Sequence, residues 1–140
     1  MAQKLVRVTV AVLAAAGVFV VAAGGVSTAQ EKKSIGDIMR AGHGKTDPLL
    51  GKVIASVKGG KWEDATAAAK SLDDNAALLQ KATPKRGDAS SWEKLSGQYH
   101  KTASDLVAAT QKKDADAAKE SWGGLTSQCM TCHKAHKGKG

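Results

Sequence analysis

Residues 129–133 read Cys129-Met130-Thr131-Cys132-His133 and hold the only two cysteines of the 140-residue chain. Two Cys residues separated by two others and followed directly by His are the attachment signature of a c-type haem. On a helical turn the two thiols can form thioethers with one porphyrin edge, while the imidazole reaches the iron. The motif therefore predicts one covalently bound haem c, with Cys129 and Cys132 as the attachment points and His133 as the proximal iron ligand.

Two other sites could use the same residues. A disulfide or a thioredoxin-like redox pair would need only the two cysteines, but no βαβ pattern surrounds them. A zinc site could recruit Cys129, Cys132, His133 and His136. These four side chains are expected on one helical face, whereas tetrahedral zinc needs ligands from several directions. Haem is the favoured interpretation, and a disulfide and zinc are the alternatives.

The N-terminal segment differs from the rest of the chain. Lys4 and Arg7 precede an uncharged run, and Ser27 and Ala29 occupy the −3 and −1 positions of a cleavage site. This pattern predicts a signal peptide over residues 1–29 and an exported, periplasmic domain over residues 30–140. An uncleaved membrane anchor is the alternative, but the run is rich in Gly and Ala, whereas a spanning helix needs ~20 mostly apolar residues. We expect no stable membrane insertion after cleavage.

The rest of the chain repeats apolar residues at helical spacing and shows no β-hairpin signal. Ser90 and Glu93 resemble a capping box at the start of one helix, and Asp114 can cap the last one. The pattern predicts an all-α, up-and-down four-helix bundle with a C-terminal haem-attachment motif. The first helix is either kinked or divided into two. The expected helices cover about residues 34–43, 49–58, 61–82, 90–112 and 115–132.

Composition and charge bear on the interior and on partners. After residue 29 the only aromatic residues are three Trp and one Tyr, and Ala fills many apolar positions. A chain of this size buries a modest core, so a large apolar group such as haem would fill the space that Ala leaves. The formal net charge is +8, with Lys134, Lys137 and Lys139 close together. We expect these lysines to attract a redox protein with an acidic docking surface rather than nucleic acid.

A haem-attachment motif on the last helix of a four-helix chain resembles the cytochrome c-prime family, the class II c-type cytochromes. Other small cytochromes c carry the motif near the N-terminus, whereas only seven residues follow His133 here. Family members have a basic residue four places after the haem His, and Lys137 matches it, which implies contact with a haem propionate. Residues 82–85 also look like the family's link between its second and third helices. The resemblance further implies homodimers formed through the first two helices.

The resemblance places the first helix on the far side of the iron. Low-spin relatives supply a Met ligand there, and Met39 lies at about that position; His43, one turn later, is the alternative sixth ligand. The favoured function is therefore a periplasmic single-electron carrier. A relative with an open sixth position would instead bind nitric oxide or carbon monoxide.

An enzyme is not expected, because peroxidase chemistry would need a distal acid–base pair such as His43 with Arg40 or Asp37, and no second motif supports it. His100 and His136 are expected at the surface.

Overall fold

The computed structural model describes residues 33–137, all of whose regular elements are α-helices. The predicted signal peptide lies outside the described residues. Within the described part, none of the helices combines the length and the apolar character that crossing a membrane requires. The helices are α1 (Ile35–His43), α2 (Leu49–Lys58), α3 (Trp62–Lys81), α4 (Ala89–Gln111) and α5 (Ala115–His136).

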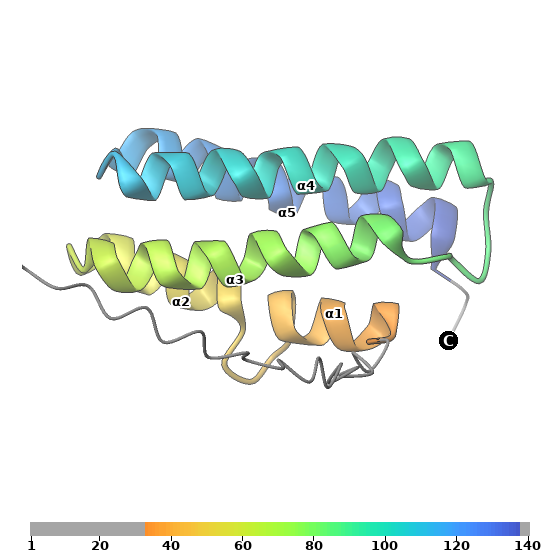
Figure 1. Cartoon of the computed structure of the whole chain (residues 1–140), viewed down its shortest axis with the longest axis horizontal. Helices are drawn as coiled ribbons and strands as arrows, with labels where there is room; N and C mark the ends of the chain where they lie inside the picture. The colour runs from red at the N-terminus through yellow and green to blue at the C-terminus, as the bar shows by residue number, and fades with distance from the viewer. Residues whose placement is uncertain (1–32, 138–140) are drawn as a thin grey trace, which may run out of the picture. The chain divides into compact units, whose positions relative to one another are not determined.

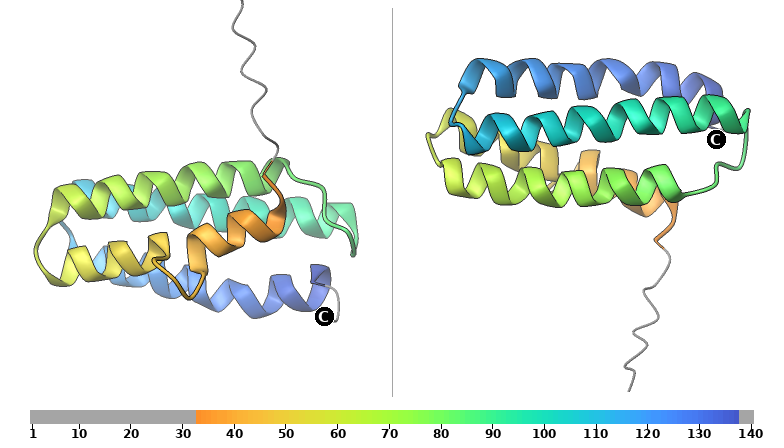
Figure 2. Two further views of the ribbon diagram at one scale, coloured as in Figure 1. Left: turned by 90° about the horizontal axis from the view of Figure 1, so that it is seen from below. Right: turned by 45° about the horizontal axis from the view of Figure 1, so that its top comes forward.

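These five helices form an up-and-down four-helix bundle whose first helix is divided. Helix α4 runs antiparallel to α3, and α5 runs antiparallel to α4. Helices α1 and α2 follow one another along the remaining side (Figures 1 and 2). Helix α1 packs against α2 and α3, whereas α2 packs against α3 and α5. The all-α bundle predicted from the periodicity is confirmed, and its first helix is two helices rather than one kinked helix.

The division between α1 and α2 has a local cause. Helix α1 ends at His43, and Gly44 caps it by donating its N–H to the carbonyl of Arg40 at 2.8 Å. Asp47 then adopts a left-handed backbone with φ +50°, and Pro48, which has no N–H to continue a helix, caps α2. The helix end at residue 43 places the His43 side chain at the division.

Side-chain caps fix the starts of α1, α4 and α5, whereas α3 begins after Lys61 without one. Ser34 and Asp37 form a capping box at α1, which was not predicted. Asp114 accepts a hydrogen bond from the Ala117 N–H at α5, as predicted. The predicted cap of the next-to-last helix is wrong. Asp88, not Ser90, caps α4 by accepting from the Ser91 N–H at 2.9 Å, and the Ser90 hydroxyl donates to the Asp88 carboxylate.

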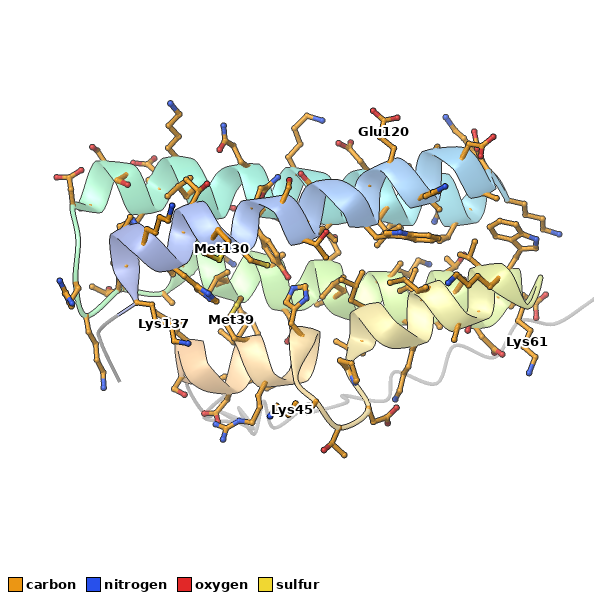
Figure 3. The ribbon with its side chains drawn as sticks, turned by 180° about the vertical axis from the view of Figure 1, so that it is seen from behind. Met39, Lys45, Lys61, Glu120, Met130 and Lys137 are labelled. Atoms are coloured by element: carbon orange, nitrogen blue, oxygen red, sulfur yellow. The ribbon has the colours of Figure 1, made fainter. Side chains whose placement is uncertain are left out.

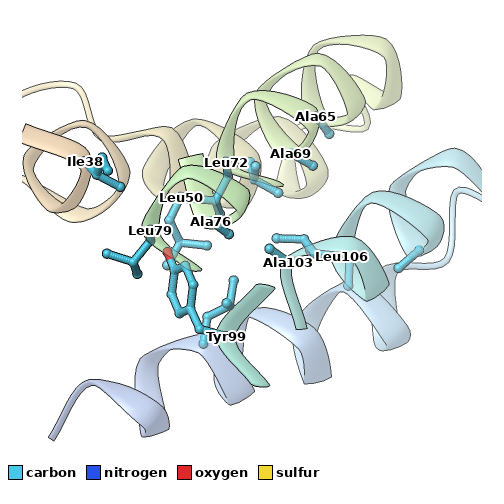
Figure 4. Close-up of a cluster of buried hydrophobic side chains, with 14 of the residues drawn as sticks. Ile38, Leu50, Ala65, Ala69, Leu72, Ala76, Leu79, Tyr99, Ala103 and Leu106 are labelled. Carbon is cyan, nitrogen blue, oxygen red and sulfur yellow. The ribbon is translucent and has the colours of Figure 1, made fainter. Parts of the chain in front are cut away.

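The core is built largely from alanine and leucine. The fully enclosed side chains of Ala65, Ala69 and Ala76 on α3 lie beside Ala103 and Leu106 on α4, and small residues allow these helices to approach closely (Figure 4). Each buried Leu contributes about 1.5–3 kcal/mol through the hydrophobic effect. Helix α1 adds one buried apolar side chain to this core, Ile38, so its other faces are free to line a cavity.

Candidate cofactor site

A cavity of about 940 Å³ lies among α1, the C-terminal half of α5, the N-terminal half of α4 and the connection between α3 and α4. This volume is near the upper end of the ~300–1,000 Å³ typical of small-molecule and cofactor sites. Its surface is mostly apolar, with contributions from Ile35, Leu79 and Leu95. The cavity is therefore suited to a large, mainly apolar ligand with a few polar groups.

Helix α5 supplies the wall that carries the cysteine motif. Cys129, Cys132 and His133 all line the cavity, and both thiols are free and half-buried. Burial raises the pKa of the Cys132 thiol, and the neighbouring Cys129 raises it further. Met130, between them, is 64% exposed and points away from the core. The helical turn thus brings the three predicted attachment and ligand residues to the cavity and leaves Met130 and Thr131 outside it.

Helix α1 supplies the facing wall. Met39 and His43, one turn apart, both line the cavity, and Figure 3 shows Met39 extending from α1 toward α5. Burial lowers the pKa of His43, and the nearby His133 lowers it further. The two predicted sixth-ligand candidates therefore lie across the cavity from the predicted proximal ligand.

Tyr99 of α4 joins the α1 side of the cavity. Its hydroxyl lies 2.6 Å from Nε2 of His43, and the two rings meet edge to face with centroids 5.8 Å apart. Tyr99 is only 9% exposed, and this burial raises the pKa of its phenol. Arg40, which also lines the cavity, pairs with Asp37 at 2.6 Å, and both side chains are largely exposed. Of the residues considered for a peroxidase, His43 thus contacts Tyr99, and Arg40 and Asp37 pair with each other.

His136 is not at the surface, and that prediction is wrong. It is 8% exposed, contacts the backbone carbonyl of Arg86 at 2.9 Å through Nδ1, and lies 3.1 Å from the Ser91 hydroxyl through Nε2. Its ring also meets Trp92 edge to face at 5.2 Å. His136 therefore ties the end of α5 to the α3–α4 connection. His100 is half-buried rather than exposed and lies 2.9 Å from the Gln80 side chain.

Two buried polar atoms of cavity-lining residues have no hydrogen-bond partner among the described residues: Nε1 of Trp92 and Oε1 of Gln128. A buried polar group without a partner is costly, so such atoms commonly meet a ligand or water. The indole N–H can only donate, and a carboxylate is a suitable acceptor. Gln128 also donates to the Thr102 hydroxyl at 3.0 Å, which fixes its orientation.

The rim of the cavity is cationic. Lys33, Arg40, Lys85 and Lys137 line it, and no Asp or Glu is among the described residues that do so. Lys137 directly follows α5, one turn after His133, where its exposed side chain can reach the cavity. Basic groups at this rim favour a ligand with peripheral carboxylates.

These features fit a haem. One wall offers two thiols and an imidazole, the facing wall offers a thioether and a second imidazole, and the rim and Trp92 Nε1 can meet carboxylates. The described residues contain no cluster of three or more His, Cys, Asp or Glu side chains placed to hold a metal ion without such a cofactor. Zinc is therefore a poorer fit than haem.

Fold and site together define a helical-bundle protein with a cofactor cavity and a haem-attachment motif on its last helix. Residues 86–137 match the family model described as Cytochrome C', a span that includes all of α4 and α5. The match confirms the family resemblance over this segment, and the family implies covalent haem c. Comparisons with curated proteins and with solved structures found no match.

The sequence analysis gave Tyr99 and Trp92 no role in the site. Both are aromatic residues with one polar atom, and a buried residue of this kind usually finds a hydrogen-bond partner. Their positions seven residues apart on one helix signalled a shared face, but not that this face borders a cavity. Gln128 carried no signal beyond its position next to Cys129.

Proposed function

We propose that this protein is an exported single-haem c-type cytochrome that carries single electrons. The observation that carries the proposal is the cavity, with Cys129, Cys132 and His133 on one wall and Met39 and His43 on the other. In this assignment the two cysteines hold haem c, His133 is the proximal ligand and Met39 is the sixth ligand. His43 is the alternative ligand, and an open sixth position would give a gas-binding protein instead.

The bound haem supplies the redox chemistry, because its iron exchanges one electron between the ferric and ferrous states. The chain's own residues hold and shield it. Apolar side chains such as Ile35, Leu79 and Leu95 would exclude water from the haem, and Trp92 Nε1 and Lys137 would hold its propionate carboxylates. A ligand on each face of the iron limits access by small molecules and keeps geometric change small, which suits electron transfer.

The partners proposed for this cytochrome are redox proteins with acidic docking surfaces. The cationic rim formed by Lys33, Arg40, Lys85 and Lys137 surrounds the cavity that would hold the haem. Complementary charge raises the rate of encounter and orients the partner toward the cofactor. The family's typical location and the predicted signal peptide support a periplasmic site of action.

The first test is expression of the full chain together with c-type cytochrome maturation proteins. We expect haem that stays with the polypeptide after denaturation, and a low-spin ferric spectrum that carbon monoxide does not readily alter after reduction. The double variant Cys129→Ser/Cys132→Ser should lose covalent haem, whereas Met130→Leu, a change of the exposed residue inside the motif, should keep it. Absence of haem would reject the proposal, and a high-spin spectrum with rapid carbon monoxide binding would indicate the gas-binding alternative.

A further inference from the structure

The hydrogen bond between Tyr99 and His43 joins two helices at the cavity. Residue 43 is the last of α1, residue 99 is in the middle of α4, and the two contact atoms are 2.6 Å apart. The phenol is enclosed on the α1 side, since a Cβ placed on Gly42 would lie 3.7 Å from its oxygen. His43 is the partner that the structure gives to this buried hydroxyl.

The hydrogen bond to Tyr99 determines whether either nitrogen of His43 has a free lone pair. A neutral imidazole has one protonated nitrogen and one nitrogen with a lone pair, and the lone pair binds a metal. If Tyr99 donates, the Nε2 lone pair is occupied by the phenol proton. If Nε2 donates, it carries a proton and has no lone pair in the plane of the ring. In that second case Nδ1 would keep a free lone pair, but the buried phenol O–H would have no acceptor. With Tyr99 as the donor, Nδ1 carries the ring proton, so neither nitrogen of His43 offers a free lone pair to an iron in the cavity.

The Met39 thioether lies one helical turn before His43 and lines the same cavity. Its side chain is unbranched and flexible, so it can adjust to a ligand position without backbone movement. Ligation by His43 would also leave the buried Tyr99 hydroxyl without its partner, which is unfavourable. Geometry and satisfaction of polar groups therefore both favour Met39.

We propose that Tyr99 is a positioning residue that holds His43 away from the iron and so selects Met39 as the sixth ligand. This inference rests on the proposed function, because it concerns the ligands of the haem. Tyr99 acts through His43 alone, and the outcome is set by whether the phenolic hydroxyl is present.

The test compares the ferric spectra of wild type and Tyr99→Phe holoprotein, after covalent haem has been verified in both. We expect wild type to show the long-wavelength charge-transfer absorption typical of Met ligation. In Tyr99→Phe the population ratio of His-ligated to Met-ligated haem should rise about tenfold, with a lower reduction potential. Thr110→Val removes another buried hydroxyl of α4, one that bonds only its own helix, and should leave the spectrum unchanged.

Met39→Ala keeps the test independent of how well Tyr99→Phe folds, and the double variant extends it. Met39→Ala should leave an open sixth position that binds carbon monoxide, because Tyr99 still holds His43, whereas Met39→Ala/Tyr99→Phe should become His-ligated. A His-ligated wild type, a Met39→Ala variant that is already His-ligated, or a Tyr99→Phe spectrum identical to wild type would overturn the inference. Loss of covalent haem in the wild type would instead refute the proposed function.

Discussion

At the scale of single residues, two glycines with left-handed backbones allow the cost of backbone strain to be distinguished from the cost of steric crowding. Gly60 has φ +69° and open space where a Cβ would lie, whereas Gly87 has φ +89° and faces His136 and the Ala135 carbonyl, whose oxygen would be 2.6 Å from an added Cβ. Gly60→Ala should cost about 1 kcal/mol of unfolding free energy through backbone strain alone. Gly87→Ala should cost about 2–4 kcal/mol, because it also displaces His136.

Urea denaturation of the two holoproteins measures this difference. Near-ultraviolet circular dichroism, which reports the Trp92–His136 contact, should change in Gly87→Ala but not in Gly60→Ala. Equal losses of stability would show that the α3–α4 connection does not pack tightly on the end of α5.

The residue scale is also where prediction from sequence was weakest. The motif located Cys129, Cys132 and His133, because spacing within five residues carries the chemistry. The burial of His136 depends on a loop 50 residues earlier, and the His43–Tyr99 bond joins residues 56 positions apart. Local patterns contain no information on such contacts, which only the packed bundle determines.

At the scale of elements, the end of α4 carries a removable strain. Lys113 follows the helix with φ +56°, a conformation that costs an L-residue energy and that glycine adopts freely. Lys113→Gly should therefore stabilise the protein by about 0.5–1 kcal/mol. Lys112→Gly is the matched control: residue 112 is right-handed, so glycine there only adds entropy to the unfolded chain and should destabilise. Thermal unfolding of both variants gives the comparison, and a loss of stability in Lys113→Gly would contradict the strain argument.

The Asp88 cap at the start of α4 makes the stability of the fold depend on pH. The Ser90 hydroxyl and then the Ser91 N–H bond the Asp88 carboxylate and hold its pKa below its usual range. A carboxyl whose folded pKa is lowered stabilises the fold above its unfolded pKa, and this contribution disappears as the pH falls through the folded value. Acidification below about pH 4 should thus lower the Tm of wild type more than that of Asp88→Asn, which keeps a capping side chain without titrating.

Ser90→Ala tests the cause of that lowered pKa, because it removes the largest contribution while keeping Asp88. Its Tm should fall less steeply with acid than that of wild type. An unchanged slope in both variants would mean that the cap does not contribute to acid sensitivity.

Helix boundaries were easier to predict than helix caps. Apolar periodicity extends over whole elements, so the expected ranges 61–82 and 90–112 agree closely with α3 and α4. A cap depends on which of several neighbouring oxygens reaches one N–H. Asp88, Ser90 and Ser91 all carry such an oxygen, and only the backbone path of the connection selects Asp88.

At the scale of the whole molecule, basic side chains lie beside the cavity, where a redox partner would have to dock to approach the proposed haem. Lys85 and Lys137 belong to the rim of the cavity, and Lys61 lies at the opposite end of the bundle, where Figure 3 labels it. A net positive charge attracts any acidic partner, but only rim charges orient it toward the cavity. Position should therefore matter more than total charge.

Lys85→Glu/Lys137→Glu should slow electron exchange with an acidic redox protein about tenfold at low salt, while Lys61→Glu should change it much less. Since the screening length falls to roughly 3 Å at about 1 M salt, the two variants should converge on wild type there. Stopped-flow rates over a salt series measure this, with reduction potentials recorded for each variant, because Lys137 lies close enough to the cavity to alter driving force directly. An equal effect of Lys61→Glu would mean that overall charge, not the rim, governs encounter; a rate difference that persists at high salt would assign the effect to the potential rather than to docking.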